Sequence, residues 1–289
     1  MPWSRIYSAI VAIILALGMI VFGGWYFTIC LGVIVYLGLH EYFDLARAKG
    51  IEPAAKTTVA MSLAMLAVST ISCDLADALF PLAGTAICFY LLFLPKLSTI
   101  ADISTSIMGL FYGGYLPSYW VRLRGLGSAE SSNLPLGGYW PEAGTTFKTL
   151  PLGLTTIAIA FSCIIAADIG AYIFGKSFGK TRLSDISPKK TVEGSVFGVA
   201  ASVAVAVAGA WYLDWSGWPF TGVALGLLIG IASLLGDLTE SMMKRDAGVK
   251  DSGQLIPGHG GILDRTDSYV FTAPLAYYFV ALLLPLLPK

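Results

Sequence analysis

The sequence predicts an all-α polytopic membrane protein with about nine transmembrane helices. Only 12% of its 289 residues are charged, against roughly 25% in a typical soluble domain, and its mean hydropathy is +0.75. A chain this apolar cannot hide its surface in one soluble core, so lipid is its expected solvent. Its net charge of zero gives no reason to expect a nucleic-acid partner.

Apolar runs of about 20 residues are long enough to cross a bilayer as helices. The first run might suggest a signal peptide, but no small-residue cleavage site ends it and a second run follows closely. Gly and Pro in the fifth run should loosen the second half of that helix. We find no internal repeat, and eight or ten spans remain alternatives to nine. The nine runs cover residues 6–23, 25–43, 57–71, 79–94, 100–119, 152–174, 196–212, 221–238 and 269–287.

The four cysteines lie in or beside these apolar runs, and no two of them form a C-x-x-C pair. We interpret them as small core residues rather than as disulfides or metal ligands. They are Cys30, Cys73, Cys88 and Cys163.

One polar stretch, residues 241–267, stands out between two long apolar runs. Four basic residues alternate with four aspartates there, beside one histidine and several glycines. Cations suit phosphate oxygens, carboxylates suit Mg²⁺, and glycines let backbone N–H groups approach an anion. The alternative is a solvated loop whose charges only mark the cytoplasmic side. The charged residues are Lys244, Arg245, Asp246, Lys250, Asp251, His259, Asp264, Arg265 and Asp267.

This stretch resembles the phosphatidate cytidylyltransferase (CDP-diacylglycerol synthase) family. The motif of that family runs S-x-x-K-R-x4-K-D-x-G/S/A-x2-hydrophobic-P-x-H-G-G-x-x-D-R-x-D. Every specified position is filled here without a departure, which makes a chance match very unlikely. The matching residues are Ser241, Lys244, Arg245, Lys250, Asp251, Gly253, Pro257, His259, Gly260, Gly261, Asp264, Arg265 and Asp267.

The resemblance implies a Mg²⁺-dependent nucleotidyltransferase of phospholipid biosynthesis. Such an enzyme transfers CMP from CTP to phosphatidate and releases CDP-diacylglycerol and pyrophosphate. It would have CTP, phosphatidate and the lipid bilayer as partners, but no nucleic acid. The resemblance also leaves room for a second, monovalent cation and suggests a homodimer. We expect a single integral-membrane domain over residues 1–289, with N-terminal spans in 1–121, a Gly-, Ser- and Pro-rich connecting loop in 122–150, and catalytic spans and loops in 151–289.

A second polar cluster follows the sixth apolar run. Asp168 is a carboxylate near the end of a predicted span and is therefore a functional candidate, although it could simply pair with Lys176. Glycines, lysines and hydroxyls after it suit a polyphosphate, but the pattern is not a Walker loop. From this looser resemblance we expect substrate contacts from Lys180, Ser187, Lys189, Lys190 and Thr191.

The eighth predicted helix supplies a third cluster, because Asp237, Ser241 and Lys244 share one face at helical spacing. We expect Asp237 and Asp264 to hold Mg²⁺ together, and the alternative for Asp237 is a salt bridge to Lys244. We expect His259 to order the loop or to contact phosphate rather than to act as a base, because a phosphate monoester is already nearly doubly charged near pH 7.

These interpretations give two sets of site residues. Catalytic roles are expected for Asp168, Asp237, Lys244, Arg245 and Asp264. Substrate contacts are expected for Lys180, Ser187, Lys189, Lys190, Thr191, Ser241, Lys250, Asp251, His259, Gly260, Gly261, Arg265 and Asp267.

Charge placement predicts the orientation. With nine spans and a cytoplasmic N-terminus, the cytoplasmic segments carry 14 of the 18 Lys and Arg residues, so the positive-inside rule puts the polar stretch in the cytoplasm. We expect the inner membrane of a bacterial-type cell. The 14 are Arg5, Arg47, Lys49, Lys56, Lys96, Lys176, Lys180, Arg182, Lys189, Lys190, Lys244, Arg245, Lys250 and Arg265.

Two other functions compete with this interpretation. In an ion-coupled secondary transporter, Asp168 and Asp237 would bind the coupling ion beside Gly-broken helices. Another CTP- or lipid-phosphate transferase, such as a polyprenol kinase, is the second alternative. The complete motif and the lack of repeat symmetry argue against the transporter.

Overall fold

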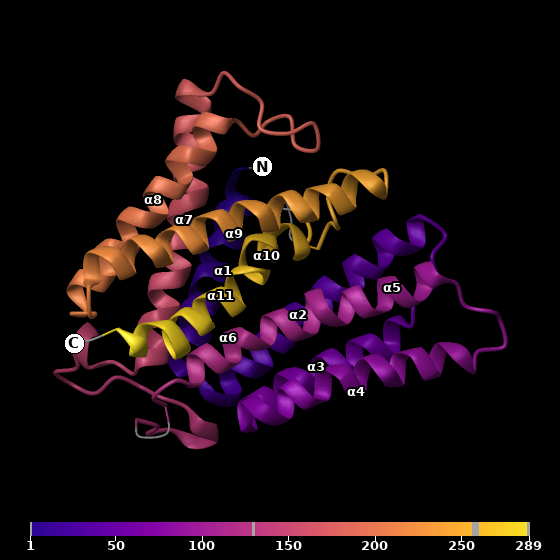
Figure 1. The fold of residues 1–289 in the computed structure, drawn as a ribbon, viewed down its shortest axis with the longest axis horizontal. Helices are drawn as coiled ribbons and strands as arrows, with labels where there is room; N and C mark the ends of the chain where they lie inside the picture. The colour runs from indigo at the N-terminus through magenta and orange to yellow at the C-terminus, as the bar shows by residue number, and fades with distance from the viewer. Residues whose placement is uncertain (1, 129–130, 256–259, 288–289) are drawn as a thin grey trace. The chain divides into compact units, whose positions relative to one another are not determined.

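The computed structural model describes residues 2–128, 131–255 and 260–287, with backbone alone for residues 2–10 and 12 (Figure 1). Its helices form nine successive stretches within the described residues, in the order of the nine predicted spans. They are α1 (Pro2–Phe22), α2 (Gly24–Ala48), α3 (Ala55–Ile71), α4 (Cys73–Leu92), α5 (Ile100–Gly109) with α6 (Leu116–Gly125), α7 (Leu152–Phe178), α8 (Val192–Tyr212), α9 (Trp218–Asp246), and α10 (Leu263–Val270) with α11 (Thr272–Tyr278).

Six of these stretches are long and apolar enough to cross a membrane, counting the described residues alone. They are α2, α4, α7, α8, α9 and the last stretch, Leu263–Leu286. The helix α3 is shorter, and the fifth stretch is interrupted. The chain is therefore an all-α polytopic membrane protein, as the sequence predicts. All four cysteines are free.

The fifth stretch is loosened where the sequence predicted it. A π-helix, Leu110–Tyr115, joins α5 to α6 and contains Gly113 and Gly114. A Cβ atom on Gly113 would run into Leu39, and one on Gly114 would run into Ser62. The glycines therefore let this helix approach α2 and α3 closely.

Several predicted boundaries were wrong because a helix continues into polar residues, and three of them bear on the site or on capping. The helix α4 begins at Cys73 rather than near residue 79, after the N-cap Ser72, whose hydroxyl accepts from Leu75 N at 3.4 Å. The helix α9 runs on to Asp246. The last stretch begins at Leu263 instead of residue 269, which places Asp264 and Asp267 on a helix.

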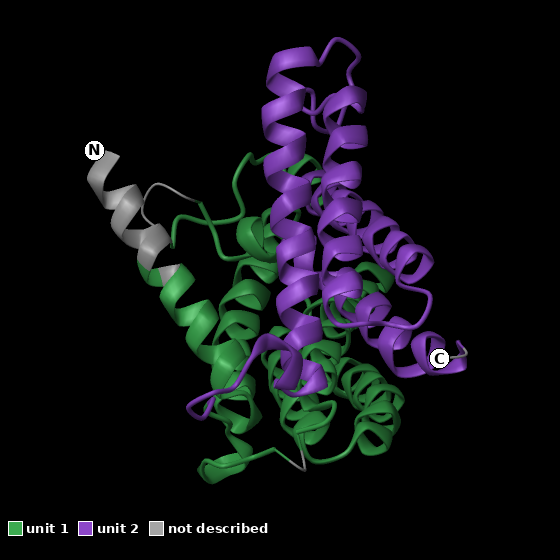
Figure 2. Ribbon diagram, turned by 90° about the vertical axis from the view of Figure 1, so that its left-hand side faces the viewer, with its two compact units in different colours: residues 1–140, 243–266 green, residues 141–242, 267–289 purple. Residues whose placement is uncertain are grey.

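The chain forms two compact units, which Figure 2 colours separately. Unit 1 comprises Met1–Trp140 and Met243–Thr266, and unit 2 comprises Pro141–Met242 and Asp267–Lys289. The chain thus passes from one unit to the other within α9 and again within α10. The single integral-membrane domain over residues 1–289 stays a prediction.

In unit 1 the buried core lies among α2, α3, α4 and the α5–α6 stretch. Large apolar side chains fill it, and none of those named here is more than 2% exposed. They include Phe27, Leu39, Phe43, Met65, Leu66, Ile87, Leu91, Leu110 and Leu123.

In unit 2 small residues bring the helices together. On α9, Gly222, Gly226 and Gly230 recur at every fourth position and face the backbone of α8. Gly198 of α8 in turn faces the backbone of α7. Close backbone approach through glycine is a common way to pack helices in lipid, where the hydrophobic effect adds little between them.

We predict that Gly226→Ala destabilises the protein by about 1–3 kcal/mol, because the new Cβ atom would overlap the backbone of Val203. Thermal unfolding in detergent measures the change. Gly18→Ala is the matched control, since no heavy atom lies within 4 Å of its Cβ position and alanine favours the helix. Equal melting temperatures for the two variants would contradict the proposed packing.

Candidate active site

A buried carboxylate in α2 organises the polar stretch of unit 1. Glu41 is 9% exposed. Its carboxylate accepts hydrogen bonds from Ser252 Oγ at 2.8 Å, Ile262 N at 3.0 Å and Leu263 N at 2.9 Å. The two amides stand at the start of α10, where a helix leaves N–H groups without internal partners. Glu41 therefore caps α10 and also joins Ser252, within the segment between α9 and α10, to α2.

Three glycines of the polar stretch make room for this arrangement. A Cβ atom on Gly253 or Gly261 would run into the Glu41 carboxylate. Gly260 has φ +82°, and a Cβ atom there would also crowd the Asp264 carboxylate. Glycine at these motif positions therefore has a steric role, because a larger side chain would displace the carboxylate of Glu41 or Asp264.

Asp264 forms the second link in the stretch. Lys244 Nζ donates to Asp264 Oδ1 at 2.6 Å, and both side chains are largely buried. Asp264 Oδ2 accepts from Ser252 N at 3.0 Å and from Gly261 N at 2.8 Å. The end of α9, the connecting segment and the start of α10 therefore meet at one carboxylate.

Unit 2 holds a separate acidic cluster. Asp237 of α9 pairs with Lys190 and accepts a 3.4 Å hydrogen bond from Ser241 Oγ. Asp168 of α7 lies close enough for the charges of Asp237 and Lys190 to act on it. The charges of Asp168, Asp237 and Lys190 also act on the buried Asp267 of α10. Three helices thus bring three carboxylates to the neighbourhood of one lysine.

The segment between α7 and α8 presents Lys190. Its start is fixed by Glu193, whose carboxylate accepts from Lys180 N at 3.1 Å and from Thr181 Oγ1 at 2.9 Å. Its end is fixed by Thr191, which caps α8 by accepting from Gly194 N at 3.1 Å. The segment is therefore an ordered turn that holds the lysine at its C-terminal end.

The comparisons with known proteins bear on this site. A model of the "Cytidylyltransferase family" matches residues 3–283. The phosphatidate cytidylyltransferase of Synechocystis sp. is 66% identical over 290 residues, which is 99% of each chain. Phosphatidate cytidylyltransferase 4, chloroplastic, of Arabidopsis thaliana is 43% identical over 265 residues, 89% of this chain and 68% of its own. A phosphatidate cytidylyltransferase of Staphylococcus aureus is 46% identical over 132 residues, 45% of this chain and 50% of its own.

The chain belongs to the phosphatidate cytidylyltransferase family. It is an enzyme of that family, so the resemblance drawn from the motif is confirmed. The ion-coupled transporter and the polyprenol kinase, the two alternative functions, are thereby set aside.

The remaining motif residues of this phosphatidate cytidylyltransferase lie mostly at the surface. Arg245 donates to Val249 O at 3.1 Å, and Lys250, Asp251 and Arg265 are exposed. In unit 2, Lys180 and Lys189 are exposed, and Ser187 accepts a backbone hydrogen bond from Lys190 N at 3.0 Å. Contacts of all these residues with substrate stay predictions. His259 and Pro257 lie outside the described residues.

Two expectations about the aspartates can be compared with the structure. Among the described ion pairs there is none between Asp168 and Lys176, whose ammonium group instead lies 6.0 Å from the ring centroid of Tyr172. Asp237 and Asp264 belong to different units, and their shared cation stays a prediction. Within the described ranges, no three His, Cys, Asp or Glu side chains gather closely enough to hold a metal ion.

Sequence reasoning placed no functional role on Glu41. The available signal was a carboxylate at the end of a predicted span, where an unpaired charge is costly. Its partners lie 211 to 222 residues further along the chain, so no local pattern could identify them.

We predict that Glu41→Gln destabilises the enzyme by about 2–3 kcal/mol, because charge-assisted hydrogen bonds are lost in a buried place. CDP-diacylglycerol formation should fall as well, since the segment before α10 loses its anchor. Thermal unfolding and an initial-rate assay measure the two effects. Asp44→Asn is the control: Asp44 lies on the same helix, exposed, and pairs with Arg47 at 2.8 Å. Equal behaviour of both variants would remove Glu41 from its organising role.

Proposed function

We propose that the polar stretch of residues 241–267 and the Asp237 cluster carry out the reaction of this enzyme, the transfer of the cytidylyl group of CTP to phosphatidate. The observation that carries the proposal is the hydrogen bonding of the motif: Glu41 and Asp264 hold Ser252 and residues 261–263, and Lys244 pairs with Asp264. Preorganised charges of this kind are what a phosphoryl-type transfer requires.

In the proposed reaction an oxygen of the phosphatidate phosphate attacks the α-phosphorus of CTP. A new P–O bond forms, the bond to the β-phosphate breaks, and pyrophosphate leaves with the electron pair. No protein nucleophile is needed, and no general base either, because the monoester is already nearly doubly charged near pH 7. The chain contributes alignment and positive charge, for which Arg245, Lys250 and Arg265 are the exposed candidates.

The metal is part of the same proposal. We assign Mg²⁺ to Asp237 and Asp264, as the motif implies, with Asp168 and Asp267 adding negative charge beside Asp237. Carboxylate oxygens are ligands that Mg²⁺ prefers, together with the phosphates of a substrate. When bound, the ion would neutralise and orient the phosphate oxygens. A second, monovalent cation and a homodimer rest on the family resemblance alone.

The orientation also remains a proposal. The polar stretch faces the cytoplasm, where CTP is found, because 14 of the 18 Lys and Arg residues would lie on that side. We assign the enzyme to the inner membrane of a bacterial-type cell. Phosphatidate would reach the site from the bilayer and CTP from water.

The metal assignment predicts that Asp237→Asn and Asp264→Asn each lower turnover by at least about 10²-fold, because either carboxylate is needed to hold the ion. The double variant should be hardly slower than the single ones, since one loss already disables the unit. The assay uses purified full-length enzyme, labelled CTP, phosphatidate and Mg²⁺, and counts lipid-extractable label with and without EDTA.

Asp246→Asn is the matched control for these variants. Asp246 lies at the end of the same helix α9, is exposed, and pairs with Lys49 at 3.4 Å. It should retain full turnover. Near-normal Mg²⁺-dependent turnover in either Asp237→Asn or Asp264→Asn would show that the metal is on other carboxylates, while the enzyme assignment would stand.

The orientation predicts the labelling of single cysteines in a variant without the four native ones. Gln254→Cys and Glu142→Cys both place a thiol at an exposed position. In intact cells an impermeant thiol reagent should modify the cysteine at 142 but not the one at 254. After the cells are opened, both should react. The reverse pattern would overturn the proposed orientation.

A further inference from the structure

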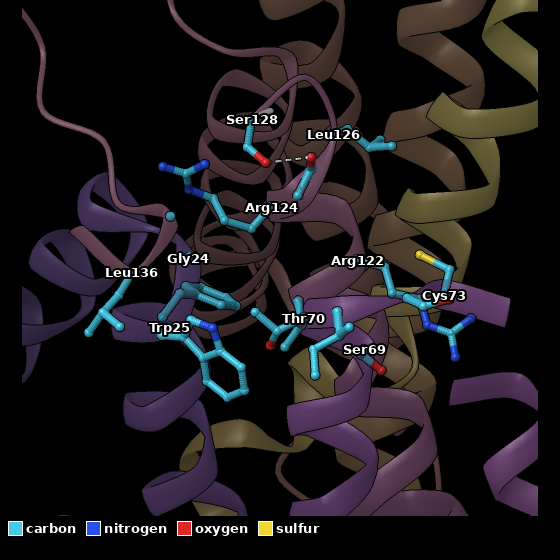
Figure 3. Close-up of a pocket in the computed structure, with 16 residues that line it drawn as sticks. Gly24, Trp25, Ser69, Thr70, Cys73, Arg122, Arg124, Leu126, Ser128 and Leu136 are labelled. Carbon is cyan, nitrogen blue, oxygen red and sulfur yellow. Dashed lines mark hydrogen bonds between the residues drawn. The ribbon is translucent and has the colours of Figure 1, made fainter. Parts of the chain in front are cut away.

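Unit 1 contains a cavity of about 450 Å³ that none of the predicted site residues lines (Figure 3). It lies among the start of α2, the end of α3, the start of α4 and the end of α6. Its 16 lining residues include two arginines and four hydroxyl side chains but no Asp or Glu. The polar ones are Ser69, Thr70, Ser72, Arg122, Arg124 and Ser128.

Arg122 is the main reason to expect a ligand here. The residue is 3% exposed, and its Nη1 pairs with Asp77 at 2.8 Å. Its guanidinium carbon lies 4.3 Å from the ring centroid of Tyr119. The Nε and Nη2 atoms are buried and have no hydrogen-bond partner among the described residues. Leaving buried donors of a charged group without an acceptor is costly, so an acceptor is expected to come from outside the chain.

Two other residues of the wall support the same conclusion. Ser69 Oγ is buried and also has no hydrogen-bond partner among the described residues. Arg124 is 2% exposed and donates from Nε to Ile20 O at 2.7 Å and from Nη2 to Val21 O at 2.8 Å. These carbonyl contacts hold its guanidinium group without neutralising the charge. Figure 3 shows Arg122 beside Cys73 and Arg124 on the side of Gly24.

The chemistry of the wall selects the ligand. The Arg122 guanidinium group and the Ser69 hydroxyl, which both have donors without a partner among the described residues, suit the oxygens of a phosphate group, and Arg124 adds a second positive charge to the wall. Apolar side chains, among them Trp25, Phe27 and Leu126, form much of the remaining wall. A volume of this size accommodates a lipid headgroup. The wall therefore favours a phosphate that is attached to a lipid over a free one.

The cavity is also distant from the polar stretch. Gly24 lines it, whereas Glu41 lies 17 residues further along the same helix α2, about 25 Å at 1.5 Å per residue. The helix α2 is long and apolar enough to cross a membrane, and in that case the two places would lie towards opposite faces of it. We propose that the cavity is a phosphate-binding site that takes the headgroup of an anionic phospholipid from the leaflet opposite to the catalytic residues.

Native mass spectrometry of the delipidated full-length enzyme tests the proposal. Phosphatidylglycerol is the probe, because it is anionic but lacks the terminal phosphate that is cytidylylated. Phosphatidylcholine and inorganic phosphate serve as the neutral-lipid and free-anion arms. The wild type should hold one phosphatidylglycerol, with clearly weaker retention of phosphatidylcholine. Arg122→Gln should weaken this binding about tenfold and Ser69→Ala about threefold. Arg47→Gln, which changes an exposed arginine of the same unit, should leave it unchanged.

Each other outcome is decisive as well. Equal affinity of the wild type and Arg122→Gln would overturn the site. Should Arg122→Gln fail to fold, as judged by its melting curve, Ser69→Ala and Arg122→Lys decide instead, and unchanged binding in both would overturn it. Binding of inorganic phosphate with the same dependence on Arg122, but none of phosphatidylglycerol, would keep the phosphate site and refute the lipid. None of these outcomes bears on whether the enzyme forms CDP-diacylglycerol, which the assay with labelled CTP tests separately.

Discussion

The Glu41 carboxylate, placed where water is largely excluded, is the constraint on which the polar stretch of this enzyme depends. A buried charge is tolerated only when hydrogen bonds surround it, and three donors from residues 252–263 do so here. The relation is mutual, because those donors are otherwise unpaired groups of a loop and of a helix start. The glycines at 253 and 261 follow from it, since any side chain there would displace the carboxylate. Two glycines of the family motif thus leave room for Glu41, a residue that lies outside the motif.

The order of the nine helical stretches could be predicted because an apolar run of suitable length has few other structures available in lipid. Helix ends were less predictable. The start of α10 contains Asp264, Arg265 and Asp267, which a hydropathy criterion assigns to a loop. It is helical because Glu41, a residue more than 200 positions away, accepts from its first amides. Ser72 likewise caps α4, but it directly precedes that helix, so this capping signal was available in the sequence.

In the candidate site, too, contacts within one helix could be predicted from the sequence, whereas contacts between distant elements could not. The helical spacing of Asp237 and Ser241 predicted that they share a face, and their side chains are hydrogen-bonded at 3.4 Å. The pairs Lys190–Asp237 and Lys244–Asp264 join different elements of the fold, and no spacing rule could select them among the many charged residues of the polar segments. The motif supplied the candidate site residues, whereas their tertiary partners required coordinates.

The charge of each polar cluster indicates which kind of ligand that cluster would bind. In a membrane protein a charge near a helix end must be compensated by a partner, by water or by a ligand. In unit 2, three carboxylates surround the single lysine with which Asp237 is paired, which favours a cation together with the phosphates it brings. At the other end of α2, two buried arginines line a cavity; Arg122 pairs with Asp77 but keeps two buried donors that have no partner among the described residues, which favours an anion. The same rule therefore supports both proposals, the metal at the acidic cluster and the lipid phosphate at the arginine-lined cavity. Asp168, Asp237, Asp267 and both arginines lie on helices, so each proposed site would have its charged groups positioned before its ligand binds.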